Sequence, residues 1–108
     1  IIEIYKDKVD PIYKYHNYNL GICLFEYVYF LNGSSTWDNI NVNDFRYDCG
    51  IQLGIQEENN KIVNNPDDYI VIGIPETGII GGRGYAKMLN IPYMQYITKN
   101  NNIRKKYG

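Results

Sequence analysis

The sequence predicts an α/β fold, and three features of the chain support this prediction. The apolar run at 69–74 is nearly continuous, as in a parallel strand that is buried on both faces. Before it, residues 41–58 carry apolar side chains at helical spacing, and after it a second helix at 79–89 precedes a second strand at 91–97. Because a right-handed crossover would connect them, we expect the two strands to be parallel neighbours in one sheet.

The composition is typical of a globular protein, and the near-neutral net charge argues against general binding to nucleic acid or membrane. The chain has 108 residues, 44% of them hydrophobic, which suits one small domain or part of a larger one. A net charge of -1 gives no general reason to expect nucleic acid or membrane as a partner. Two cysteines do not make a disulfide framework, and no apolar run is long enough to span a bilayer, so we expect a cytoplasmic, reducing location.

The first part of the chain predicts strands. Residues 1–6 alternate in part, residues 7–11 have turn residues, and residues 12–15 can return as a partner strand, so we expect a β-hairpin. Residues 22–31 are aromatic and β-branched and predict another strand, with Glu26 in its middle. A loop at 32–35 follows.

The first helix is predicted at 41–58, with Asn41 or Asn43 as its N-cap. Its expected apolar stripe consists of Val42, Phe45, Cys49, Gln52, Leu53 and Gln56. A polar loop at 59–68 leads to the first parallel strand. Because two parallel strands do not make a stable sheet, we expect the chain to be an internal piece of a longer protein, and Ile1 in place of an initiator Met agrees with this.

The turn between the strand at 69–74 and the helix at 79–89 is the main candidate site. It contains Pro75, Glu76, Thr77 and Gly78. Such a turn directs backbone N–H groups and a helix N-terminus at one point, which attracts anions, phosphate above all. The alternative is an ordinary strand-to-helix turn. The helix should end at Asn90, which can adopt a left-handed cap.

The end of the chain is basic. Lys99, Arg104, Lys105 and Lys106 lie within the last ten residues. A solvated end is one interpretation, and a mobile arm that closes over phosphates is the other. We expect a mobile loop from Lys99 onward.

Blocks of sequence along the chain resemble those of the amidophosphoribosyltransferases, in the order and at about the spacing of that family. The blocks lie at 23–30, at Arg46 with Gly50, and at 71–78, 84–86, 90–93 and 99–100. They extend over residues 21–100. Each block alone is weak, but the ordered set is specific.

The resemblance implies the first half of a type I phosphoribosyltransferase domain, with a Rossmann-like parallel sheet, preceded by a β-hairpin and strand segment. Residues 1–20 would end an N-terminal glutaminase domain. Residues 21–40 would be a connecting strand and loop. Residues 41–108 would form the N-terminal half of the phosphoribosyltransferase domain.

The resemblance also implies an activity, which is the formation of 5-phosphoribosylamine from phosphoribosyl pyrophosphate (PRPP) and glutamine-derived ammonia, the first step of purine synthesis. Mg²⁺ would accompany PRPP, and the full-length protein would be a homo-oligomer. Pro75, Glu76, Thr77 and Gly78 would form the pyrophosphate loop, and Lys99 would be the catalytic residue at the start of a flexible loop. No residue is implied as a metal ligand. We expect no turnover from these residues alone.

Two departures from the family pattern favour an alternative. After Lys99 and Asn100 the family usually continues Arg-Tyr-Val-Gly-Arg, whereas this chain has Asn-Asn-Ile-Arg-Lys, so that Arg104 or Lys105 would have to replace the loop arginine. The second helix has glycines at 81, 82 and 84 where the family favours Ala. The alternative is a non-catalytic remnant or phosphate-binding module. Another PRPP-using transferase is disfavoured, because simple salvage enzymes lack the block at 23–30.

Further side chains have more than one interpretation. Cys23 matches a position that ligates an iron–sulfur cluster in some family members, but a cluster needs four ligands and the chain has two cysteines, so we expect a buried structural thiol. Glu26 either faces outward or is buried and paired, with Arg46 as the candidate partner. Asp67 and Asp68 precede a strand instead of following one, which favours a solvated loop over a metal pair.

Overall fold

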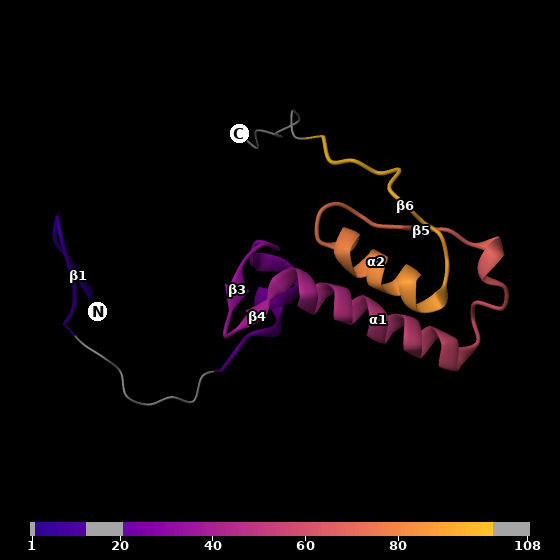
Figure 1. Cartoon of the computed structure of the whole chain (residues 1–108), viewed down its shortest axis with the longest axis horizontal. Coiled ribbons are helices and arrows are strands. Elements are labelled where there is room, and N and C mark those ends of the chain that lie inside the picture. The colour runs from indigo at the N-terminus through magenta and orange to yellow at the C-terminus, as the bar shows by residue number, and fades with distance from the viewer. Residues whose placement is uncertain (1, 13–20, 101–108) are drawn as a thin grey trace, which may run out of the picture.

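Two packed helices and a parallel strand pair make up the centre of the molecule. The computed structural model describes residues 2–12 and 21–100. Helix α1 (Val42–Asn60) packs along helix α2 (Gly78–Leu89), and α2 lies between α1 and the strands β5 (Val71–Ile72) and β6 (Tyr93–Met94) (Figure 1). β5 and β6 pair in parallel, as the predicted crossover requires. The order helix, strand, helix, strand is therefore confirmed.

The ends of the two helices follow from local chemistry. The side chain of Asn41 accepts hydrogen bonds from the backbone N–H groups of Asn43 and Asp44, at 2.9 and 3.2 Å, which makes Asn41 the N-cap of α1. Asn90 ends α2 in the left-handed conformation, with φ of 55°, and its N–H group donates to the last turn of the helix. Both caps agree with the sequence prediction.

Glycines let α1 and α2 approach until backbone touches backbone. A Cβ atom added at Gly50 would collide with the carbonyl oxygen of Gly81, and one at Gly84 would collide with the carbonyl oxygen of Tyr47. At the far end of the crossing, a Cβ at Gly54 would lie 2.7 Å from the Cβ of Met88. The close contact between the helices therefore explains the glycines at 50 and 84. Glycine has a lower helix propensity than Ala, but a larger residue would not fit at these positions.

The predicted apolar stripe of α1 is fully buried only at Val42, and the other buried residues of the helix lie outside it. The buried residues of the helix are Val42, Arg46, Gly50 and Gly54, whereas Leu53 is 58% exposed. Phe45, Cys49, Leu53 and their neighbours instead line an open, mostly apolar depression. The pattern of hydrophobic residues could not show this, because the face toward α2 is selected for small size and not for hydrophobicity.

The predicted strand at 22–31 is also wrong. Its residues form a helical segment that includes η1 (Glu26–Phe30), a π-helical turn. Tyr27 is buried and packs its ring against Trp37 and Phe45, with centroids 5.6 and 5.0 Å apart. β-Propensity describes how aromatic residues fit a pleated surface, and here a helical turn gives Tyr27 a better-packed position.

Short strand pairs complete the structure. The strands β1 (Ile2–Ile4) and β2 (Val9–Pro11) form the predicted hairpin, although the return strand begins earlier than predicted, within residues expected to form the turn. Residues 13–15 lie outside the described residues. The strands β3 (Thr36–Trp37) and β4 (Ile40–Asn41) form a second hairpin, and a single 3-10 turn, η2 (Pro66–Asp68), precedes β5.

The strands β5 and β6 are shorter and more exposed than predicted. We expected burial on both faces of 69–74, but Ile70 is 53% exposed and Ile74 is 63% exposed. The reason is that within the described part of the chain each strand has one neighbour, so the sheet has no further strands to shield it. The core is formed by Tyr27, Val42, Ala86, Leu89 and Ile91.

Candidate functional site

The candidate site is the turn that joins β5 to α2. Its loop closes on itself, because the N–H group of Gly78 donates to the carbonyl oxygen of Ile74 at 3.0 Å and that of Ile79 donates to Glu76 at 3.4 Å. The Pro75–Glu76 peptide bond is cis. Thr77 is the N-cap residue, yet its side chain makes no capping hydrogen bond. No side chain therefore caps the N-terminus of α2 at the position where an anion would bind.

Gly73 fixes where the turn begins. A Cβ atom at this position would lie 2.7 Å from the Cα atom of Ile79 and 2.6 Å from the hydroxyl oxygen of Tyr93. Its carbonyl oxygen accepts a hydrogen bond from the side-chain amide of Gln95 at 3.1 Å, which links the end of β5 to the residues that follow β6. The first turn of α2 thus lies directly against the strand that leads to it.

Lys99 lies beside the turn, as an ion pair with Glu76. Its ammonium nitrogen is 3.6 Å from a carboxylate oxygen of Glu76, and both side chains are mostly exposed. Such an exposed pair contributes little to stability. The ion pair instead places the cation of Lys99 next to the N-terminus of α2. The structure therefore brings Lys99 together with the turn at 75–78, whereas Arg104 and Lys105 lie outside the described residues.

A depression of about 400 Å³ opens beside the turn. One side is formed by η1 and the residues after it, and the other by the turn and α2. Its lining consists of Tyr29, Phe30, Leu31, Asn32, Gly33, Asn43, Arg46, Glu76, Thr77 and Ile80. The depression places polar backbone and side-chain groups within reach of a molecule that is bound at the turn.

The hydrogen bonds of Arg46, which lines this depression, could not be predicted from the sequence. Its guanidinium donates from Nε to the carbonyl oxygen of Tyr27 and from Nη2 to that of Leu31, each at 2.8 Å. The proposed pairing with Glu26 is therefore wrong, because Arg46 binds backbone carbonyls at the end of η1. A helical end has carbonyl groups without an intrahelical partner, and a cation satisfies them well.

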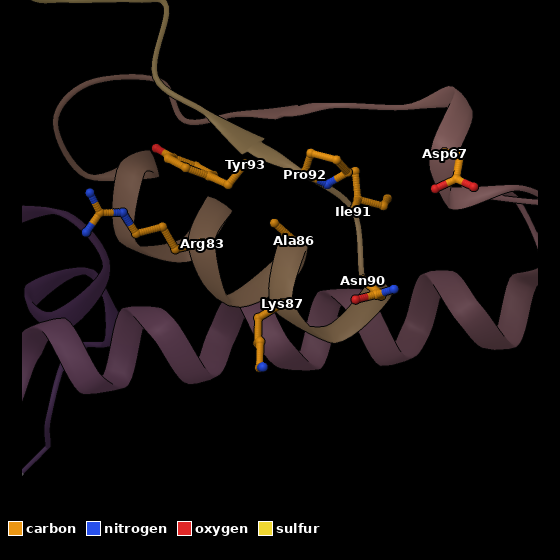
Figure 2. A pocket seen from close by; sticks show the side chains of 8 residues that line it. All are labelled: Asp67, Arg83, Ala86, Lys87, Asn90, Ile91, Pro92 and Tyr93. Atoms are coloured by element: carbon orange, nitrogen blue, oxygen red, sulfur yellow. The ribbon is translucent and has the colours of Figure 1, made fainter.

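A second depression, of about 410 Å³, lies along the other end of α2 (Figure 2). Arg83 and Lys87 project from the helix, and Asp67 of η2 also lines the depression. The guanidinium of Arg83 lies 5.6 Å from the centroid of the Tyr93 ring. This depression is at the C-terminal end of α2, where the helix dipole disfavours anions, so it is a poorer phosphate site than the turn.

Within the part of the chain that the structure describes, neither cysteine belongs to a cluster of metal ligands. Cys23 is exposed and Cys49 is half-buried, so the expected burial of Cys23 is wrong: no part of the described chain covers it. Among residues 2–12 and 21–100, no three His, Cys, Asp or Glu side chains come together as ligands. The same residues contain no helix of the length and apolarity needed to cross a membrane.

Known proteins resemble this chain in both sequence and structure. The human amidophosphoribosyltransferase is 29% identical over 110 residues, a match that covers 99% of this chain and 20% of the human protein. A solved structure described as the allosteric regulatory enzyme of purine biosynthesis superposes with a TM-score of 0.74 at 28% identity, over 97% of this chain and 21% of that one. This chain is related in sequence and in fold to the amidophosphoribosyltransferases. No protein-family model matches it.

A second solved structure agrees with this relationship. The glutamine PRPP amidotransferase of Bacillus subtilis, solved in complex with ADP and GMP, is 32% identical, and the superposition has a TM-score of 0.66 over 87% of this chain. The resemblance to amidophosphoribosyltransferases and the α/β fold class are thus confirmed. The chain spans about a fifth of the length of the relatives it matches. The division at residues 20 and 40 stays a prediction.

Proposed function

We propose that this chain supplies the pyrophosphate-binding wall of an amidophosphoribosyltransferase, which makes 5-phosphoribosylamine from PRPP and glutamine-derived ammonia. The observation that carries the proposal is the turn at 75–78, where a helix N-terminus without a side-chain cap meets the cation of Lys99. The relatives carry the name of this activity, which supports the choice of substrate. Glutamine, ammonia and a homo-oligomeric assembly would belong to the whole protein.

Pyrophosphate would be the leaving group of this reaction. Displacing pyrophosphate from the sugar carbon builds negative charge on its oxygens, so N–H donors and cations that are already in place lower the barrier. In this chain the donor would be the amide of Thr77 in the turn, since the amide of Gly78 already donates to Ile74, and the cation would be Lys99. Mg²⁺ bound to PRPP would offset further charge on the leaving group.

The Glu76–Lys99 pair gives the site a defined change on binding. Pyrophosphate carries more charge than one carboxylate, so it would compete with Glu76 for the ammonium group of Lys99. Because the pair is exposed, breaking it costs little. We therefore expect Lys99 to turn from Glu76 to the ligand when pyrophosphate binds.

Titration with inorganic pyrophosphate tests the proposal directly. We expect amide signals of Thr77, Gly78 and Ile79 to shift in proton–nitrogen spectra, and Lys99→Gln to weaken binding about fivefold, the size of one partly screened charge near a helix terminus. Lys87→Gln is the matched control, because it removes an equal charge at the opposite end of the same helix. Equal losses in the two variants, or no shift at the turn, would refute the proposed site.

A turnover assay separates binding from catalysis. With ammonia, PRPP and Mg²⁺, we expect no pyrophosphate release from the 108-residue chain, since the ribose-phosphate side of the site is not among its residues. Clear release of pyrophosphate would show that this expectation is wrong. The non-catalytic remnant remains the alternative, and it rests on the residues after Asn100 and on Gly81 and Gly82, because Gly84 now has a packing explanation. Sequencing the native transcript through both ends would decide between the two.

A further inference from the structure

Arg46 is a buried cation that has no acidic partner among the residues that the structure describes. The residue is 8% exposed, and within the described part of the chain no carboxylate forms an ion pair with it. Its Nε and Nη2 atoms donate to backbone carbonyls, and no buried side-chain nitrogen or oxygen of the described residues lacks a hydrogen-bond partner. A buried charge is costly unless its hydrogen bonds or neighbours offset that cost, so its presence calls for a reason.

Arg46 also lines the depression beside the turn and holds one of its sides in place. Through its guanidinium it holds the carbonyls of Tyr27 and Leu31, which fixes the end of η1. It lines the depression together with Glu76 and Thr77, and it lines an adjoining apolar one with Thr77 and Gly78. Its backbone carbonyl lies where α1 crosses α2, 3.4 Å from the position of a Cβ atom on Gly81.

We infer that Arg46 is a positioning residue of the anion site, one that holds the η1 wall opposite Glu76 and Thr77 and leaves a positive charge behind the turn. The inference rests on the proposed function. The carbonyl dipoles of Tyr27 and Leu31 hold the guanidinium without cancelling its charge, as a carboxylate would. An anion at the turn is therefore attracted by α2, by Lys99 and, through low-dielectric protein, by Arg46.

Two variants separate the charge of Arg46 from its geometry. Arg46→Met removes the charge and the hydrogen bonds at similar length, and Arg46→Lys keeps the charge but cannot donate to both carbonyls in the same way. Gly54→Ala is the matched control, since its Cβ would crowd Met88 at the far end of the same helix pair and lower stability without touching any charge.

The experiment has two readouts in one titration. Pyrophosphate affinity is followed through the amides of Thr77 and Gly78. The position of η1 is followed through Trp37, the only tryptophan in the chain, which stacks on Tyr27 with centroids 5.6 Å apart. We expect about tenfold weaker binding in Arg46→Met and about threefold in Arg46→Lys, a Trp37 emission change in both, and unchanged affinity in Gly54→Ala.

The affinities of the variants for pyrophosphate decide whether Arg46 acts on the anion site or only on stability. Unchanged affinity in Arg46→Met overturns the inference, and so does an equal loss in Gly54→Ala, because that would make the effect one of stability. If Arg46→Met does not fold, Arg46→Lys decides alone: wild-type affinity with unchanged Trp37 emission overturns the inference. A wild-type chain that does not bind pyrophosphate at the turn overturns the proposed function itself, and this is seen before any variant is made.

Discussion

Replacing Gly84 with Ala should destabilise the protein, although Ala is the better helix former. A Cβ atom at residue 84 would collide with the carbonyl oxygen of Tyr47, and it would also lie 3.1 Å from the carbonyl carbon of that residue and 3.2 Å from the amide nitrogen of Ile51. All of these atoms are backbone, so no side-chain rotation can relieve the contact. Helix α1 would have to move away from α2.

The magnitude follows from two opposing effects. Overpacking of this kind costs about 1–3 kcal/mol, and sometimes more. Replacing a helical glycine with Ala returns about 1 kcal/mol. Because the clash is with backbone atoms, the overpacking cost should lie at the upper end of its range, and we expect Gly84→Ala to lower the free energy of unfolding by about 2 kcal/mol.

Gly81→Ala is the control three residues earlier on the same helix. Its Cβ would lie 3.4 Å from the carbonyl oxygen of Arg46, which is an ordinary van der Waals contact. This variant should keep the propensity gain and become about 1 kcal/mol more stable. Urea unfolding followed by circular dichroism measures both. If Gly84→Ala were as stable as Gly81→Ala, the close approach of α1 and α2 would be refuted.

Other predictions concern caps and ionisation. Asn41→Ala should lower the free energy of unfolding by about 1 kcal/mol and Asn41→Asp should preserve it, as measured by urea unfolding; equal losses would argue against the cap. Asn90→Gly should be tolerated and Asn90→Ala should lower the melting temperature, because φ is 55° there. Burial, aided by the nearby carboxylate of Glu57, raises the pKa of Tyr85 above its ordinary value of 10.0. The stability that comes from neutral Tyr85 should be complete below pH 10.0 and be lost as the pH rises through the higher folded-state pKa; in Tyr85→Phe this part of the alkaline dependence of the melting temperature should vanish.

Local signals were enough to predict helices α1 and α2, the N-cap of α1 and the end of α2. Asn41 and Asn90 are residues whose side chains favour an N-cap and a left-handed C-cap, and both occupy those positions. The turn at 75–78 could likewise be located, because an apolar run, a proline and a glycine occur in order along the chain. These features depend on residues a few positions apart.

Features that depend on distant residues could not be predicted. The helical conformation of Tyr27 depends on Trp37, Phe45 and Arg46, which lie 10 or more positions away and give no local signal. The buried face of α1 could not be found from hydrophobicity, because Gly50 and Gly54 bury backbone rather than side chain. The sequence suggested Lys99 for the site, but its pairing with Glu76 required the structure.

The open strand pair has a consequence for handling the protein. Each of β5 and β6 pairs with one neighbour among the described residues, and Ile70, Ile72 and Ile74 are 53%, 37% and 63% exposed. An apolar strand with an unpaired edge is a template for pairing with a strand of another molecule. Solutions of this chain should therefore lose monomer as concentration rises, through ordered edge-to-edge aggregation that begins at these isoleucines.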